Sequence, residues 1–213
     1  MNYRAERVPP VLSSRHRIRD WTWFVLTMLL GSVWVYLVIL PFINPSDHLW
    51  QQEVTQYQGN LALFCLGIIL YASGLSRWLP AIVKDRRWLG LMAFGLAVAH
   101  TISGFKHTLG GDWQGWQFLG PLEQGALGIG VLSLLLLTVL ALTSNNWSVQ
   151  TLGKGWKVLH RSLFYPAVIL ALLHTAGLGV HFRWSTPQGL INLLLVALTL
   201  VGALWLRRTV SPR

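Results

Sequence analysis

Residues 152–177 constrain the fold more than any other part of the chain, because this stretch is apolar and yet holds two histidines. His160 and His174 are 14 residues apart, so in an α-helix they return to nearly the same face at about 100° per residue. At about 1.5 Å of rise per residue, they lie roughly 21 Å apart along the axis. One imidazole then lies toward each side of a hydrocarbon core about 30 Å thick. Because an ionisable group in a membrane is costly without a partner, this stretch predicts a membrane helix with a function.

Composition extends the membrane assignment to the whole chain. Hydrophobic residues make up 53% of the 213 residues and charged residues only 11%, with a mean hydropathy of +0.49, as is typical of integral membrane proteins. Six apolar segments are long enough to be spans: 21–43, 59–78, 88–105, 125–143, 152–177 and 188–206. We therefore predict an all-α integral membrane protein. A six-transmembrane-helix bundle (21–206) lies between a basic N-terminal tail (1–20) and a short C-terminal tail (207–213).

Basic residues predict the orientation of this bundle. Of the 17 Lys and Arg residues, 15 lie on one side of the bundle: in the two tails, in the connection between spans two and three with Arg77 beside it, and at the start of span five, at Lys154, Lys157 and Arg161. Only Lys106 and Arg183 lie on the other side. By the positive-inside rule both termini are cytoplasmic, an N-in/C-in arrangement. The net charge of +10 is explained by orientation in membrane lipid, and we expect no nucleic-acid partner.

Two histidines on different predicted helices fall at the same depth. In the predicted orientation, helices three and five both run outward from the cytoplasm. His100 lies 12 residues beyond Trp88, roughly 18 Å into the membrane, and His174 lies at a comparable depth on helix five. Two imidazoles on facing helices can clamp a six-coordinate haem b between helices 3 and 5. The alternative is that each histidine is a polar side chain hydrogen-bonded within the bundle.

The cytoplasmic end of helix five is less regular. The residue level with His160 on helix three is Arg86, with Arg87 beside it, and not a histidine. His160 is therefore a candidate ligand of a second haem whose other ligand is absent or is not histidine. Alternatively, Arg86, Arg87 and Arg161 bind haem propionates or a flavin phosphate. A third interpretation makes His160 a structural residue at a helix end.

Two more histidines repeat the spacing on the outer side. His107 follows His100 by seven residues, and His181 follows His174 by seven. Seven residues make nearly two helical turns, so each pair shares a face if the helices continue that far. This repeated spacing has three interpretations: the two outer histidines contact haem propionates, they bind an external metal, or the repeat is a coincidence. A single cysteine, Cys65, excludes a disulfide framework and a cysteine-ligated iron–sulfur cluster.

Several short motifs resemble those of a known family. They are Arg86-Arg87-Trp88-Leu89-Gly90-Leu91, Ala99-His100, Thr143-Ser144, Leu152-Gly153-Lys154, Trp156 and Leu159-His160-Arg161. In this order and spacing, residues 59–206 resemble the ferric reductase-like transmembrane superfamily. Within it, the resemblance is strongest to the haem-binding membrane subunits of bacterial periplasmic methionine sulfoxide reductase systems.

The resemblance implies a multi-pass cytochrome of a bacterial inner (cytoplasmic) membrane. In that family, electrons from a separate cytoplasmic flavin reductase or from membrane quinol pass through haem b to an acceptor on the outer side. FMN or a quinone is thereby implied as a further cofactor, and a protein or a ferric chelate as the acceptor. The family's haem histidines match His100, His160 and His174. One haem is predicted, or two if His160 is also a ligand.

We expect no nucleotide-binding module of its own in this chain. NADPH oxidases and ferric reductases carry a flavin and nicotinamide module after their last helix, whereas this sequence ends seven residues after its last predicted span. Gly125, Gly128 and Gly130 lie inside an apolar segment, and they predict close helix packing and not a dinucleotide site. The chain is then an oxidoreductase component. Two alternatives stay open: a self-sufficient quinol- or flavin-linked reductase of ferric chelates or oxygen, and a non-redox accessory subunit.

Overall fold

The computed structural model describes residues 48–74 and 80–178, with scattered residues between 185 and 201, and this described part is helical. Its elements are α3 (His48–Gly74), α4 (Pro80–Thr108), the 3₁₀ helix η1 (Trp113–Phe118), α5 (Pro121–Leu142), α6 (Asn146–Leu152) and α7 (Lys154–Leu178). The predicted first span and most of the predicted sixth span lie outside the described residues. Spans two to five correspond to α3, α4, α5 and α7.

Three of the helices are long and apolar enough to cross a membrane. By length and composition these are Arg86–Thr108 within α4, Pro121–Leu142 and Lys154–Leu178, among the residues that the structure describes. They agree with the predicted third, fourth and fifth spans to within a few residues. The described part of the chain therefore fits an all-helical membrane protein.

Two boundaries differ from the prediction. Helix α3 begins at His48, 11 residues before the predicted start of the second span. Helix α4 begins at Pro80, so residues 80–87, predicted as a connection, are helical. Proline suits the first turn of a helix, because the N–H that it lacks has no partner inside the helix there. Pro80 therefore begins a helix within the predicted connection.

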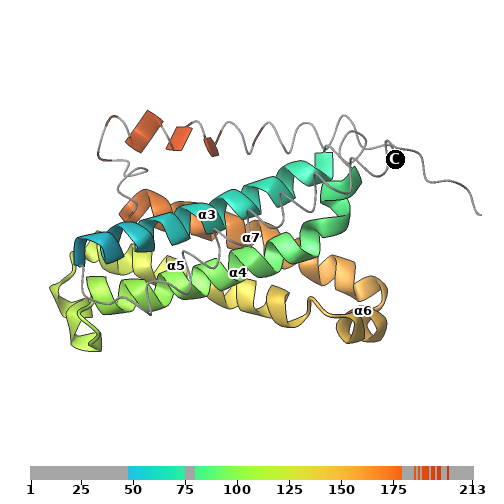
Figure 1. Cartoon of the computed structure of the whole chain (residues 1–213), viewed down its shortest axis with the longest axis horizontal. Helices are drawn as coiled ribbons and strands as arrows, with labels where there is room; N and C mark the ends of the chain where they lie inside the picture. The colour runs from blue at the N-terminus through green and yellow to red at the C-terminus, as the bar shows by residue number, and fades with distance from the viewer. Residues whose placement is uncertain are drawn as a thin grey trace, which may run out of the picture.

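The helices pair as two antiparallel hairpins, as Figure 1 shows. Helix α3 lies along α4, and α5 lies along α7. Helices α4 and α7 run in the same direction, from the end of the bundle near α6 to the end near η1 (Figure 1). This confirms the predicted parallel course of helices three and five, which places equivalent residues of the two helices at equivalent depths.

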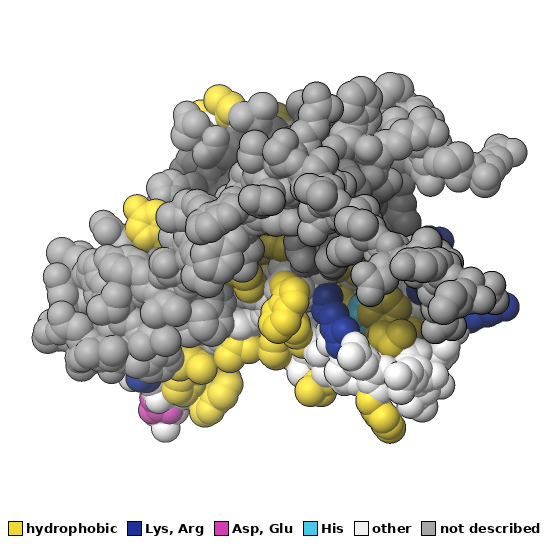
Figure 2. Space-filling view, turned by 45° about the vertical axis from the view of Figure 1, so that its right-hand side comes forward, with side chains coloured by type: hydrophobic (Ala, Val, Ile, Leu, Met, Phe, Trp, Pro, Cys, Tyr) yellow, Lys and Arg dark blue, Asp and Glu magenta, His cyan; other side chains and the backbone are white. Residues whose placement is uncertain are grey.

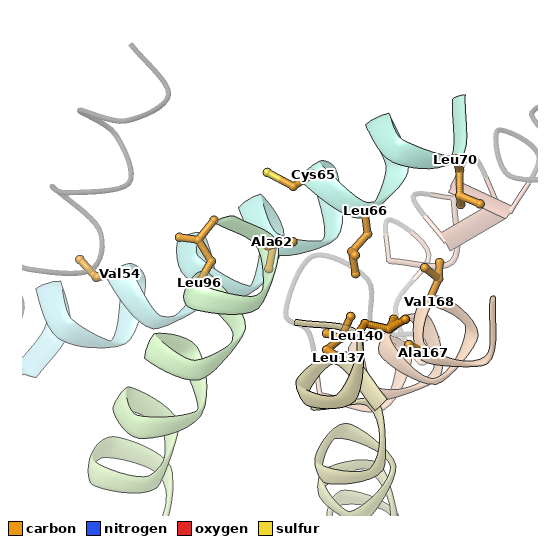
Figure 3. Close-up of a cluster of buried hydrophobic side chains, with 11 residues drawn as sticks. Val54, Ala62, Cys65, Leu66, Leu70, Leu96, Leu137, Leu140, Ala167 and Val168 are labelled. Atoms are coloured by element: carbon orange, nitrogen blue, oxygen red, sulfur yellow. The ribbon is translucent and has the colours of Figure 1, made fainter. Parts of the chain in front are cut away.

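A shared apolar core joins the two hairpins. The buried side chains come from all four long helices, as Figure 3 shows: Val54, Ala62, Cys65, Leu66 and Leu70 from α3, Ala93 and Leu96 from α4, Leu137 and Leu140 from α5, and Ala167 and Val168 from α7. Ser133 of α5 donates its hydroxyl to the carbonyl of Ala167 at 2.8 Å, which fixes α5 against α7. Other apolar side chains of α5 are exposed and available to lipid: Val131, Leu132, Leu135, Val139 and Leu142.

The short helix α6 makes the turn between α5 and α7. Asn145 accepts a hydrogen bond from the backbone N–H of Ser148 at 2.7 Å, which caps the start of α6. Gly153 separates α6 from α7 with a φ of +52°, a conformation that favours glycine. Two helices therefore meet at a sharp corner at one end of the bundle.

Charge is distributed unequally between the two ends of the bundle. Figure 2 shows most of the Lys and Arg side chains in view toward the end where α6 lies, and acidic side chains at the other end. The described basic residues near α6 are Arg86, Arg87, Lys154, Lys157 and Arg161. The η1 end has Lys106 together with Asp112 and Glu123. The charge difference predicted from the sequence therefore runs along the bundle axis.

Candidate functional site

His100 of α4 and His174 of α7 face each other across the two hairpins. Their ring centroids are 6.0 Å apart, and the planes of the rings cross at 79°. Each histidine lies within the last three turns of its helix, toward the η1 end of the bundle. The structure thus brings together the two residues that the sequence placed at equal depth.

Each of these imidazoles is held by a backbone carbonyl of the helix paired with its own. Nδ1 of His100 lies 2.8 Å from the carbonyl oxygen of Thr55 on α3. Nδ1 of His174 lies 2.8 Å from the carbonyl oxygen of Ala126 on α5. A carbonyl can only accept, so both rings donate from Nδ1, and the neutral ring then has its lone pair on Nε2. Hydrogen bonding of one ring nitrogen to a carbonyl commonly orients the other nitrogen toward a metal.

Two glycines leave room for the rings. A Cβ atom at Gly59 of α3 would lie 3.1 Å from Nδ1 and Cε1 of His100. A Cβ at Gly130 of α5 would lie 2.5 Å from Nδ1 and 2.8 Å from Cε1 of His174. The prediction of close packing is therefore confirmed for Gly130. No such packing is seen at Gly125 and Gly128, where an added Cβ would have no atom of the described residues within 4 Å.

The arrangement fits two axial ligands of one metal. An imidazole–metal–imidazole sandwich has ring centres about 6 Å apart, because a metal–nitrogen bond is about 2 Å long and each nitrogen is about 1 Å from its ring centre. The observed separation is 6.0 Å. No group of three or more His, Cys, Asp and Glu side chains within the described residues is placed to hold a metal ion. A haem would supply four nitrogens of its own, so two histidines from the protein would complete a six-coordinate site.

His160 lies at the other end of α7 in a different environment. Its Nε2 is 3.0 Å from the hydroxyl oxygen of Thr143, the residue that follows α5. Its ring lies against Trp156, with centroids 4.0 Å apart and planes inclined by 30°. The indole N–H of Trp156 donates to the carbonyl of Thr143 at 2.8 Å. His160, Trp156 and Thr143 thus form a contact between α7 and the end of α5.

The predicted arginines have different surroundings. Arg87 donates from Nε to the carbonyl of Ser144 at 2.6 Å and from Nη1 to Oδ1 of Asn146 at 2.7 Å. Arg86 is half-buried, and Arg161 is exposed on α7. Because Ser144 follows Thr143 directly, Arg87 and His160 contact the same connection, and Arg87 is adjacent to Arg86, the residue predicted to be level with His160. Arg87 therefore links the first hairpin to the second.

The outer pair of histidines is described in part. Helix α4 continues through His107 to Thr108, so His107 lies on the same helix as His100, as its seven-residue spacing required. His107 is half-buried. His181 lies outside the described residues.

Sequence analysis missed the residues that orient the histidines. Thr55 and Ala126 act through backbone carbonyls, which any residue type provides, so their identity gives no signal. The two glycines at 59 and 130 are a usable signal, because each lies on the helix that precedes a histidine-bearing helix and each is four residues after the accepting carbonyl.

Comparison with known proteins gives a family and several relatives. Residues 58–172 match the family model described as ferric reductase like transmembrane component. A protein-methionine-sulfoxide reductase heme-binding subunit MsrQ of Yersinia pseudotuberculosis serotype O:1b (strain IP 31758) is 27% identical over 197 residues, which cover 88% of this chain and 92% of the relative. The MsrQ of Yersinia pestis (strain Pestoides F) is also 27% identical, over 88% of this chain and 91% of the relative.

No solved structure shows significant similarity to the chain. The family match includes α4, η1, α5 and α6 in full, α3 from residue 58 onward, and α7 as far as Leu172. Its 115 residues are more than half of the 213 in the chain, and they contain His100 and His160. This protein belongs to the ferric reductase like transmembrane family, as an integral membrane protein similar to the MsrQ subunits.

Proposed function

We propose that this chain is a membrane-embedded electron-transfer subunit and that it holds one haem b between His100 and His174. The observation that carries the proposal is the pair of imidazoles whose ring centroids are 6.0 Å apart, each hydrogen-bonded through Nδ1 to a carbonyl of its own hairpin. The names of the MsrQ relatives, which are heme-binding subunits, support the same conclusion. Haem b supplies a one-electron carrier when it is bound between two such ligands.

The chain's own residues have three tasks in this function. His100 and His174 offer Nε2 lone pairs from helices α4 and α7. The carbonyls of Thr55 and Ala126 accept from Nδ1, which fixes the direction of each ring and leaves the lone pair of the neutral ring on Nε2. Three apolar residues at or next to the site in sequence, Val54, Ala99 and Ala126, are buried, which limits access of water to it. Low polarity around a haem is one of the means by which a protein sets its reduction potential.

We further propose that electrons enter from the α6 end and leave at the η1 end. The α6 end is the more basic, and by the positive-inside rule this supports a cytoplasmic position of that end in a bacterial cell. The donor is then a cytoplasmic flavin reductase, through FMN, or membrane quinol. The acceptor on the outer side is a protein or a ferric chelate. His100 lies eight residues from the end of α4, about 12 Å, so the site is nearer the outer side.

A reduced-minus-oxidised visible spectrum of the purified full-length chain, with haem quantification, tests the proposal. The wild type is expected to show a low-spin haem b at one per chain. His100→Ala and His174→Ala each remove a ligand, and each should give five-coordinate haem or lose it. A colourless wild type, or two single variants with wild-type haem content and spectra, would overturn the assignment.

Each ligand has a matched control in the next residue. Thr101 and Thr175 follow His100 and His174, and each hydroxyl donates only to the carbonyl four residues earlier on its own helix, at 2.8 Å. Thr101→Val and Thr175→Val therefore change the same turns without touching a ligand, and both should keep wild-type spectra. Reduction of ferric citrate by the purified chain with quinol alone would support the self-sufficient reductase in place of a subunit.

A further inference from the structure

Two glycines lie against the two histidines in matched positions. Gly59 on α3 faces His100, and Gly130 on α5 faces His174. In both cases, the carbonyl that accepts the Nδ1–H belongs to the residue four positions before the glycine. Four residues are about one helical turn, so each of these helices presents a carbonyl and a glycine to the ring on one face. The same arrangement is therefore built twice, once in each hairpin.

The two glycines differ in how closely the ring approaches. A Cβ at Gly130 would lie 2.5 Å from Nδ1, 2.8 Å from Cε1 and 3.0 Å from Cγ of His174, distances at which the ring or the helix must move. A Cβ at Gly59 would lie 3.1 Å from Nδ1 and Cε1 and 3.5 Å from Nε2 of His100, so a displacement of a few tenths of an ångström suffices. An alanine at either position is expected to turn the ring, more strongly at position 130.

Ring rotation is the degree of freedom that these glycines control. The χ2 torsion of histidine is broad, so the hydrogen bond at Nδ1 fixes which edge of the ring faces the neighbouring helix but leaves the tilt of its plane adjustable. The glycine backbone lets each plane lie close to that helix. The resulting planes cross at 79°.

We propose that Gly59 and Gly130 are positioning residues that hold the two ligand planes nearly perpendicular and so set the electronic character of a haem bound between them. This inference rests on the proposed function. Axial imidazoles with crossed planes leave two iron d orbitals close in energy and give a strongly anisotropic ferric electron paramagnetic resonance signal. Parallel planes separate those orbitals and give a rhombic signal. The residues around a ligand can therefore change the electronic structure of the haem even when the ligand itself stays the same.

Electron paramagnetic resonance and redox titration of the purified, full-length holoprotein test this inference. The wild type is expected to give the anisotropic signal. Gly130→Ala should lose that signal and shift the midpoint potential, and Gly59→Ala should show a smaller change of the same kind. Gly128→Ala on α5 and Gly67→Ala on α3 are the controls, because an added Cβ there has no atom of the described part of the chain within 4 Å. Both controls replace a helical glycine with alanine, as the test variants do, and so raise helix propensity equally. Their electron paramagnetic resonance signal and midpoint potential should match those of the wild type.

The outcomes separate this inference from the proposed function. A wild type with a rhombic signal, or alanine variants at 59 and 130 that match the controls, would overturn the positioning role and leave haem binding intact. If Gly130→Ala loses haem altogether, Gly59→Ala decides, since its ring needs the smaller displacement. If the wild type holds no haem, or if His100→Ala and His174→Ala both keep the wild-type spectrum, the proposed function fails. The positioning role then fails with it.

Discussion

His160 and Thr143 meet where α5 ends and α7 begins, with Nε2 of the histidine 3.0 Å from the threonine hydroxyl oxygen. That hydroxyl has one proton and makes a shorter contact, 2.7 Å, with the carbonyl of Val139, which can only accept. His160 therefore donates from Nε2. His100 and His174 donate from Nδ1 instead. Among these three described histidines, the tautomers are therefore opposite at the two ends of the bundle: Nε2 carries the lone pair in His100 and His174 but not in His160.

The first prediction follows from this difference. We expect His160→Ala to keep the wild-type haem content and spectrum and to lower stability by about 1–2 kcal/mol, because a hydrogen bond and the ring contact with Trp156 are lost. Haem quantification and thermal unfolding measure the two effects. Thr143→Val is the control, since it removes the same hydrogen bond and keeps the ring contact. A halved haem content in His160→Ala would place a second haem at this end.

The second prediction concerns Arg87, which binds Ser144 and Asn146 through two different nitrogens. Arg87→Lys keeps the charge, but a single ammonium group does not reproduce this forked geometry. We expect a loss of about 1–2 kcal/mol in stability, seen as a lower unfolding temperature, with unchanged haem content. Arg161→Lys, at an exposed position, should leave the unfolding temperature unchanged. Equal stability of Arg87→Lys and wild type would mean that only the charge matters.

The third prediction tests electron entry at the basic end. Lys157 and Arg161 are exposed on α7 near α6. Replacing both with Glu should slow the reduction of the bound haem by reduced FMN several-fold, because the flavin phosphate is repelled. The effect should fade at high ionic strength. Lys106→Glu, at the other end, is the control and should leave the rate unchanged. If the Lys106 variant alone is slower, electrons enter at the η1 end.

The fourth prediction tests orientation. Gln117 of η1 and Gln150 of α6 are both exposed, and Cys65 is buried, so the unsubstituted chain should resist labelling. A membrane-impermeant maleimide applied to intact spheroplasts should label Gln117→Cys and reach Gln150→Cys only after the membrane is opened. The reverse pattern would exchange the sides of donor and acceptor.

The sequence predicted the helices that carry the site, because membrane spans need long apolar segments and these are visible in composition alone. The depth match of His100 and His174 was also predictable, since helical rise converts residue number into distance. In the structure the centroids of the two rings are 6.0 Å apart, so the two histidines do lie level with each other in the bundle. Their role as ligands stays a prediction, as does the role of His160 and the three arginines.

Other features depend on tertiary contacts that residue types do not reveal. The carbonyls of Thr55 and Ala126 are present in every residue, so only the packing of the hairpins identifies them. The short helices η1 and α6 have six and seven residues, too few for an apolar period to be recognised. The partners of Arg87 lie 57 and 59 residues further along the chain, which no local pattern indicates.

The division of the site between two hairpins bears on how the protein is made. Each hairpin orients its own imidazole with a carbonyl from within the same hairpin. His174 is synthesised 74 residues after His100, so the first half of the site can form while the second is still on the ribosome. A ligand that needs both imidazoles is captured only when the two finished halves dock. Completion of the site thus reports the last step of assembly in the membrane, and a chain that ends after α5 would retain one oriented histidine and no clamp.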